Sequence, residues 1–220
     1  RPEIRELTKD QRERFFNAIK VLNSDKGNNK FTGYSTIHNI YFNEIHFNPS
    51  FFPWHRAYLR MFEKDLQSID SSIILPYWDW SLDSDDPTNS IILSDEYFGK
   101  NGDKDTHCVT SGPFANFMVN VPKRHCLKRD YNKGDKVTPF YPPESIEAII
   151  ASSKNYITFR NVIEYLPHSV IHTNIGGAVG DLSDFFSPND PLFYMHHAFI
   201  DLLWHEWQLR NPSLANSYSG

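Results

Sequence analysis

The alternation of hydrophobic and polar positions along the chain predicts a mainly α-helical protein. Apolar residues recur three and four positions apart, as on the buried face of an amphipathic helix. The stretch 83–143 is instead polar and rich in turn residues, so we expect a loop-rich insertion with few short strands there. We also expect a turn over 26–30 and a buried apolar segment over 72–80. The helices are expected over 8–22, 31–41, 53–70, 143–151, 159–173 and 191–209.

This element order favours a four-helix bundle with long loops, folded as a single domain over 1–220. Thr8 and Gln11 have the spacing of a capping box, which predicts the start of the first helix. Pro53 suits the first position of a helix. Pro167 lacks a backbone N–H, so we expect it to perturb the helix over 159–173.

Composition and charge exclude some classes of function. The sequence is 40% hydrophobic and 15% aromatic, which is enough to build a core. Its net charge is −5 and it has no run of more than two lysines or arginines, which argues against a nucleic-acid surface. No stretch approaches the roughly 18 apolar residues of a membrane span. We therefore expect neither nucleic acid nor a membrane span, and no sequence feature indicates an oligomeric state.

Each of the two cysteines follows a histidine, in the pairs His107-Cys108 and His125-Cys126. Two cysteines and two histidines are a possible zinc set, but adjacent ligands fit a tetrahedron poorly. The preferred interpretation is a disulfide between Cys108 and Cys126, which would add about 3 kcal/mol of stability. Two reduced thiols are the other alternative. A disulfide would favour a secreted protein or one in a secretory vesicle.

The placement of the ten histidines is the main chemical signal. His168 and His172 are four residues apart, so they share one face of a helix. Four further histidines lie on or beside predicted helices: His38, His46, His55 and His197. A lone histidine in an apolar stretch is more often a core residue than a ligand, so the group carries more weight than any member.

The surrounding residues favour copper over other metals. Imidazole binds zinc, copper, iron and nickel. A di-iron bundle uses Glu-x-x-His pairs, and no glutamate here has a histidine three residues later. The His-Glu-x-x-His motif of zinc proteases is also missing. Neutral imidazoles without a carboxylate ligand favour a redox metal that is stable as a +1 ion.

Two long strings around these histidines resemble the copper-binding signatures of the tyrosinase family. HFNPSFFPWHRAYLRMFE at 46–63 resembles the first signature, and DPLFYMHHAFID at 190–201 resembles the second. Two shorter strings are also similar, LPHSVIH at 166–172 and ILPYWDW at 74–80. The resemblance covers nearly the whole chain and is weak only in the loop-rich region.

This family comprises tyrosinases, catechol oxidases and molluscan-type oxygen carriers. The resemblance implies two copper ions that bind dioxygen and act on small phenols. His38, His46 and His55 would hold the first ion, and His168, His172 and His197 the second. In the doubled histidine the family pattern assigns ligation to His197. His196 points about 100° away on the helix and is expected to be buried beside the ligands.

The resemblance also implies roles for residues around the ligands. Phe51 and Phe193 stand four residues before a ligand and are expected to pack on imidazoles, which differs little from ordinary core packing. Arg56 and Asp201 flank ligands, and we expect each in a buried charge pair. The remaining family positions are expected to be scaffold: Glu63, Trp78, Asp79 and Trp204.

The implied activity is oxidation of o-diphenols to o-quinones, with monophenol hydroxylation in some members. In related enzymes a glutamate and an asparagine are thought to hold a water that takes the phenol proton. Glu164 stands at the plant-type glutamate position, with a structural carboxylate as the alternative. Ser169 replaces the asparagine, so we expect weaker monophenol hydroxylation. Thr173 is expected at the rim of the substrate pocket.

Two departures from the family pattern bear on the site. Glu44 stands where several members carry a cysteine bonded to the second ligand, so that thioether cannot form. Few residues follow the last predicted helix, so we expect an open site without a covering domain. A dioxygen carrier and a copper-free structural relative are the alternatives. The first is disfavoured by the missing cover, and the second by histidine at all six ligand positions.

Overall fold

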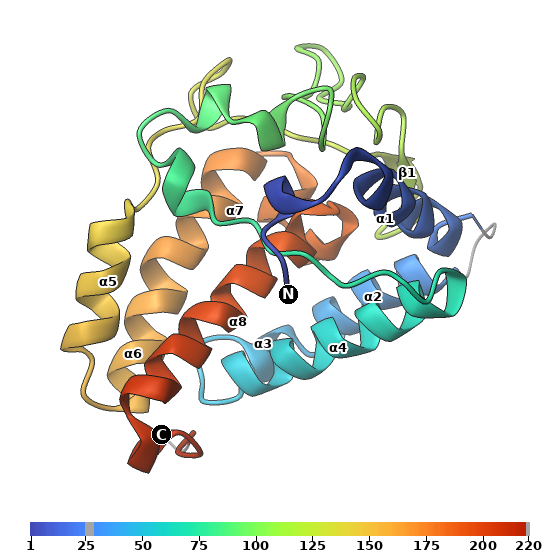
Figure 1. Cartoon of the computed structure of the whole chain (residues 1–220). Helices are drawn as coiled ribbons and strands as arrows, with labels where there is room; N and C mark the ends of the chain where they lie inside the picture. The colour runs from blue at the N-terminus through green and yellow to red at the C-terminus, as the bar shows by residue number, and fades with distance from the viewer. Residues whose placement is uncertain (25–28, 219–220) are drawn as a thin grey trace.

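The computed structural model describes residues 1–24 and 29–218 and confirms the expected fold class (Figure 1). The turn expected over 26–30 falls mainly outside these ranges. The helices are α1 (Lys9–Leu22), α2 (Lys30–Ile40), α3 (Phe42–Ile45), α4 (Phe51–Ile69), α5 (Pro143–Ser152), α6 (Tyr156–Ile163), α7 (Ser169–Gly176) and α8 (Leu192–Arg210). A short ribbon pairs β1 (Met118–Val119) with β2 (His125–Cys126) antiparallel.

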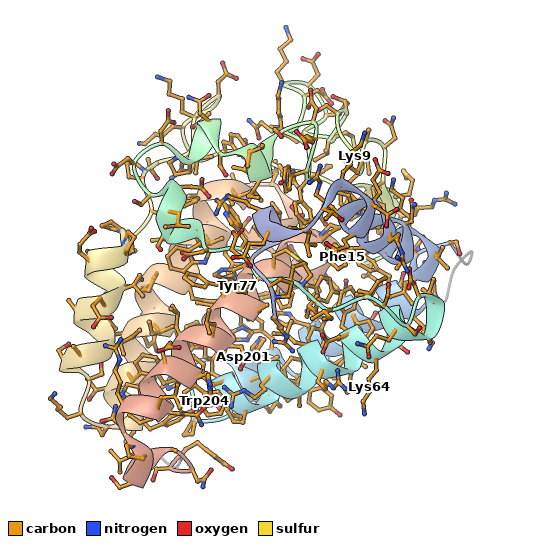
Figure 2. All side chains as sticks on the ribbon, viewed as in Figure 1. Lys9, Phe15, Lys64, Tyr77, Asp201 and Trp204 are labelled. Carbon is orange, nitrogen blue, oxygen red and sulfur yellow. A yellow bond between two sulfur atoms is a disulfide. The ribbon has the colours of Figure 1, made fainter. Side chains whose placement is uncertain are left out.

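Helices α4 and α8 pack against each other at the centre of the bundle. Helix α1 lies on α4, and α5 packs on α6 and α8 at the outer edge (Figure 1). The first nine residues of α8, 192–200, are all buried, as expected for a helix with neighbours on every side. Helices at the surface instead have one buried face and one exposed face. Phe15 points into the core, whereas Lys9 and Lys64 face solvent (Figure 2). Within the described residues, no helix is long and apolar enough to cross a bilayer.

The helix boundaries follow local capping chemistry. The Thr8 hydroxyl accepts the Gln11 N–H at 3.3 Å and the Gln11 side chain accepts the Thr8 N–H at 2.9 Å, which confirms the capping box. Helix α4 begins two residues before Pro53 rather than at it. The N–H groups of the first helical turn have no intrahelical acceptor, so a proline at any position in that turn costs no hydrogen bond. The short α3 was not predicted, since four residues are too few to show a period.

The helix expected over 159–173 consists of α6 and α7 joined by a π-helical segment, Glu164–His168. Pro167 lies inside this segment. Proline has no N–H, and its ring clashes with the carbonyl four residues earlier, so the chain widens locally. The helical run also begins earlier than expected, at Tyr156, because the Asn155 side chain accepts the Thr158 N–H at 2.8 Å.

The segment over 72–80 is buried, as expected. The side chains of Leu75, Trp78 and Trp80 are inaccessible to solvent. The backbone N–H of Trp78 donates to the carbonyl of Met195 at 3.2 Å, which fixes the segment against α8. In the loop-rich region a disulfide joins Cys108 to Cys126, with Cα atoms 5.6 Å apart. The expected disulfide is therefore present, and the alternative zinc set with two thiolates is excluded.

A buried ion pair fixes the start of α8. Nε and Nη2 of Arg129 donate to the two carboxylate oxygens of Asp190 at 2.7 and 2.9 Å, and both side chains are fully buried. Asp190 also accepts the N–H of Leu192, the first residue of α8, at 3.0 Å. Arg129 reaches the carbonyls of Phe98 and Gly99 as well. The loop-rich region is thereby attached to the helix that carries His197.

We expect Arg129→Leu to lower the free energy of unfolding by about 3–5 kcal/mol, because it leaves the Asp190 carboxylate buried without a partner. Arg210→Leu is the matched control, since Arg210 makes the same two-pronged pair with Glu147 on the surface. There the change should be small, because water replaces the partner. Urea unfolding of both variants measures the difference, and equal small losses would contradict this account.

Candidate metal centre

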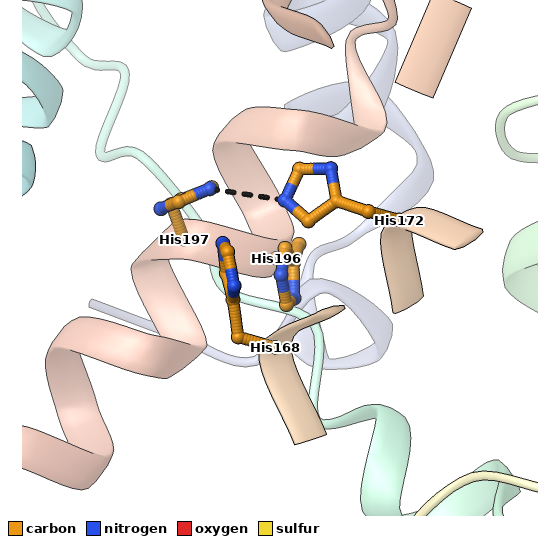
Figure 3. A group of neighbouring side chains, drawn as sticks. All are labelled: His168, His172, His196 and His197. Atoms are coloured by element: carbon orange, nitrogen blue, oxygen red, sulfur yellow. Dashed lines mark hydrogen bonds between the residues drawn. The ribbon is translucent and has the colours of Figure 1, made fainter. Parts of the chain in front are cut away.

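Buried and half-buried histidines form two adjoining groups in the bundle core. The first holds His38 on α2, His46 after α3 and His55 on α4. The second holds His168, His172, His196 and His197 from the π-helical segment, α7 and α8 (Figure 3). Within each group the potential ligand nitrogens lie within 4.8 Å of one another. The rings of His55 and His197 stack with centroids 4.4 Å apart, so the two groups share one centre. The structure thus brings all six expected ligands together.

Backbone carbonyls orient five of these imidazoles through Nδ1. A neutral ring that donates from Nδ1 keeps its lone pair on Nε2, where a metal can bind. The Nδ1···O distances are 2.9 Å from His38 to Phe185, 3.1 Å from His46 to Phe42, 2.7 Å from His55 to Phe51, 3.0 Å from His168 to Glu164 and 2.6 Å from His172 to Leu182. Nε2 of His38, His55 and His168 is buried without a hydrogen-bond partner in the described part of the chain.

The spacing and charge state of the rings also fit a metal. Nε2 of His172 lies 3.3 Å from Nε2 of His197 (Figure 3). Two nitrogens roughly 2.0 Å from one ion at a tetrahedral angle lie about 3.3 Å apart. Burial lowers the pKa of His38 to about 3 and the pKa of His46 and His172 to about 4. The rings are therefore neutral near pH 7, as ligation requires.

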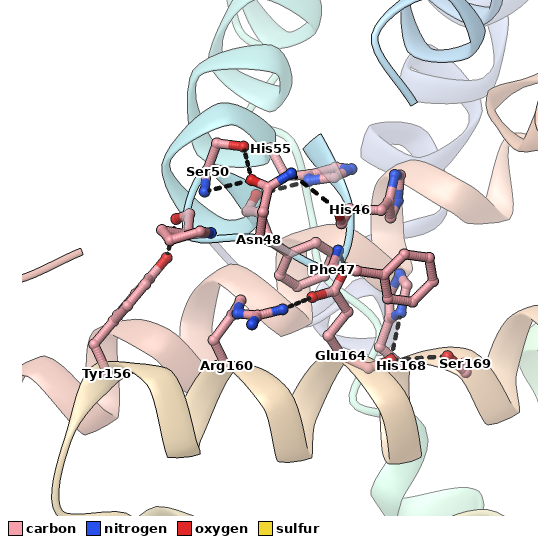
Figure 4. Close-up of polar contacts among 12 residues, drawn as sticks. His46, Phe47, Asn48, Ser50, His55, Tyr156, Arg160, Glu164, His168 and Ser169 are labelled. Carbon is pink, nitrogen blue, oxygen red and sulfur yellow. Dashed lines mark hydrogen bonds and ion pairs between the residues drawn. The ribbon is translucent and has the colours of Figure 1, made fainter. Parts of the chain in front are cut away.

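Glu164 connects the two histidine groups (Figure 4). Its carboxylate is fully buried and accepts the Phe47 N–H at 2.6 Å and Nη1 of Arg160 at 2.7 Å. Its carbonyl accepts Nδ1 of His168 and the Ser169 hydroxyl at 3.0 and 2.8 Å. Burial raises the pKa of Glu164, while the donors from Phe47 and Arg160 act in the opposite direction. Glu164 thus joins the π-helical segment that carries His168 to Phe47, which follows His46.

The residues expected around the ligands lie as follows. Phe51 packs on His55 and His168 with ring centroids 4.9 and 5.0 Å apart. Phe193 stacks on His197 at 4.1 Å. Arg56 and Asp201 form one pair with each other between α4 and α8, with side chains 35% and 17% exposed. The pair is half-buried because the Arg56 guanidinium lies over the Trp204 ring, 3.8 Å from its centroid, near the surface.

A cavity of about 140 Å³ opens beside both groups. Four histidines line it: His38, His46, His168 and His172. Phe42, Phe47 and Phe185 give it aromatic walls, and its polar lining includes Ser169, Thr173 and Asp184. Thr173 is exposed and lies at the cavity, in the position expected for it.

Comparison with known proteins identifies the family. The model described as the common central domain of tyrosinase matches residues 23–210. This chain belongs to the tyrosinase family. It is 34% identical to tyrosinases of Streptomyces antibioticus and Streptomyces glaucescens, over 94% of this chain and 82% and 81% of theirs. A tyrosinase-family chain with these histidine groups is a type 3 copper oxidoreductase, and its cofactor is a pair of copper ions.

Solved structures support the same assignment. The structure is similar to a polyphenol oxidase from Thermothelomyces thermophila, with a TM-score of 0.82 and 27% identity over 94% of this chain and 69% of that one. It also shares its fold with a functional unit of octopus hemocyanin, with a TM-score of 0.70 and 21% identity over 97% of this chain and 55% of that one.

Asp181 supports the second histidine group and was not predicted from the sequence. Its carboxylate accepts Nε2 of His125 at 2.9 Å, the Asn189 side chain at 3.0 Å and the Lys128 N–H at 2.8 Å. The next residue, Leu182, supplies the carbonyl that orients His172. Because these partners are far apart in sequence, no local pattern marks them. The disulfide-bonded ribbon thus supports a ligand through Asp181.

The His125–Asp181 pair predicts a pH-dependent contribution to stability. The hydrogen bond to Asp181 raises the pKa of His125 above its usual 6.5. The contribution is therefore complete below about pH 6.5 and is lost as pH rises through the raised folded-state pKa. We expect His125→Gln to lose more unfolding free energy at pH 6 than at pH 9, measured by urea unfolding. His205→Gln, at an exposed position on α8, is the control. A loss that is the same at both pH values would refute this role.

Proposed function

We propose that this protein oxidises o-diphenols to o-quinones with dioxygen and hydroxylates monophenols more slowly. The observation that carries this proposal is the aromatic cavity of about 140 Å³ that reaches the histidines. An apolar cavity of about 150 Å³ holds one benzene molecule. The cavity therefore suits a single phenolic ring, and the tyrosinase relatives support a phenol as substrate.

His38, His46 and His55 hold one copper ion in this proposal, and His168, His172 and His197 hold the other. The bound copper pair supplies the electron transfer between phenol and dioxygen. The protein positions the ligands and the substrate and keeps water away from the site. Carbonyl groups orient five of the six rings so that Nε2 turns inward, and Phe42 stacks on His46 at 4.2 Å where both line the cavity. The aromatic walls orient the substrate ring by edge and face contacts.

The weaker monophenol activity rests on Ser169. Hydroxylation of a monophenol needs a proton acceptor beside the phenol. Ser169 lines the cavity, but its hydroxyl donates to the Glu164 carbonyl. The Glu164 carboxylate already accepts two hydrogen bonds, from Phe47 and Arg160. A water at this place is therefore held more weakly than by an asparagine, which offers both a donor and an acceptor.

We expect Ser169→Asn to raise the ratio of monophenol to diphenol kcat/KM by about tenfold. This is less than the roughly hundredfold or more of a well-placed general base, because the asparagine only orients a water. Thr173→Asn, one helical turn further along the same cavity wall, is the matched control and should leave the ratio unchanged. Initial rates with a monophenol and its o-diphenol give the ratio. An unchanged ratio in Ser169→Asn, or an equal rise in both variants, would show that position 169 does not set this preference.

The proposed function is tested by the absorption spectrum of the copper-loaded protein with peroxide, followed by addition of a catechol. We expect a strong near-ultraviolet band that disappears as quinone accumulates. A band that persists without quinone would indicate a dioxygen carrier, and the absence of copper binding would indicate a structural relative. His172→Ala should lower the copper content from about two ions per chain to about one and abolish the band. His205→Ala, outside the site, should change neither.

We further propose that residues 1–220 form one catalytic domain that works in an oxidising compartment. One hydrophobic cluster extends through the described residues from Ile4 to Trp207, which supports a single domain. The disulfide between Cys108 and Cys126 supports the compartment, because such bonds are rare in reducing cytosol.

A further inference from the structure

The second histidine group contains His196, which the proposed ligand set does not use. This side chain is fully buried. Its ring stacks on His168 with centroids 5.2 Å apart and lies 4.9 Å from the ring of His172 (Figure 3). Its potential ligand nitrogen lies within 4.8 Å of those of His168, His172 and His197. Distance alone therefore does not keep His196 from binding the metal.

A hydrogen bond from Trp80 distinguishes His196 from the ligands. The indole Nε1–H donates to Nδ1 of His196 at 3.1 Å. An indole nitrogen only donates, so Nδ1 of His196 carries the lone pair and the ring's hydrogen is on Nε2. The five rings oriented by carbonyls have the opposite arrangement, with Nδ1 donating and the lone pair on Nε2. With the Trp80 bond in place, neither nitrogen of His196 offers a free lone pair.

The structure holds Trp80 firmly in this position. Its side chain is fully buried and its ring meets Phe199, one turn after His196, edge to face at 5.0 Å. The backbone bond from Trp78 to Met195 fixes the same segment beside His196. With its hydrogen on Nε2, His196 has one buried N–H without a partner in the described part of the chain. With the hydrogen on Nδ1, two buried N–H groups, that of the ring and that of the Trp80 indole, would face each other without an acceptor, which is more unfavourable.

We propose that Trp80 is a positioning residue that keeps His196 out of copper coordination by holding its hydrogen on Nε2. The proposal rests on the proposed copper centre for the identity of the metal. Its consequence is that the second copper receives three protein nitrogens rather than four. A catalytic metal site keeps a position open for its substrate, and a fourth imidazole would close it. Trp80 thereby selects His197 over its neighbour and preserves the open position.

Nitrogen NMR of the full chain with labelled histidine tests this directly, because it reports which ring nitrogen carries hydrogen. It is applied to the copper-free and the copper(I)-loaded protein. In the wild type we expect His196 to carry hydrogen on Nε2 in both states. In copper-free Trp80→Phe we expect most of the His196 signal to move to the form with hydrogen on Nδ1. After copper(I) loading of this variant, we expect Nε2 of His196 to show metal binding. Trp78→Phe is the matched control, since its buried indole donates to Asp83 and its loss should leave His196 unchanged.

A second variant keeps the proposal testable if Trp80→Phe does not fold. His196→Gln should still bind about two copper ions per chain, whereas His197→Gln should bind about one. The proposal is overturned if wild-type His196 carries hydrogen on Nδ1, if Trp80→Phe leaves it unchanged, or if His196→Gln loses a copper ion. Failure of the wild type to bind copper would refute the proposed function instead, and the copper-free spectra would still decide the state of His196.

Discussion

Each ligand imidazole has to be neutral and has to turn a nitrogen without hydrogen toward the metal, and backbone carbonyls meet that demand for five of the six proposed ligands. Three Nδ1 acceptors are carbonyls four residues earlier along the chain, at Phe42, Phe51 and Glu164. The other two are carbonyls of Leu182 and Phe185, between α7 and α8. One short segment therefore orients a histidine of each group, so the two halves of the centre are positioned together.

That segment is in turn held by the loop-rich region. Asp181 binds His125 on the disulfide-bonded ribbon, and Asp190 binds Arg129. The sequence presents 83–143 as an insertion with little periodicity, yet its residues fix both ends of the segment that supplies the two carbonyls. Buried carboxylates with complete partners are rigid supports, because any displacement leaves a charge unpaired in a low dielectric. The insertion is thus a functional part of the metal centre.

The long helices and the six proposed ligands could be predicted from the sequence, because helical periodicity and extended strings are local signals. The perturbation at Pro167 was also predictable, since proline breaks a known hydrogen bond. Its π-helical form was not, because the chain has several ways to widen. The pairs Arg129–Asp190 and Trp80–His196 join residues 61 and 116 positions apart. Such contacts depend on the tertiary fold, so no periodicity or motif in one sequence marks them.

The centre is asymmetric in a way that suits an oxidase. The cavity reaches His38, His46, His168 and His172, whereas His55 and His197 do not line it. These last two stack on each other and pack against Phe51 and Phe193, on the two helices that form the middle of the bundle. Their surroundings are buried and closely packed, and close-packed interiors resist displacement. In the proposed reaction, the substrate would approach from the side built from shorter elements, while the opposite side would fix the separation of the two metal sites.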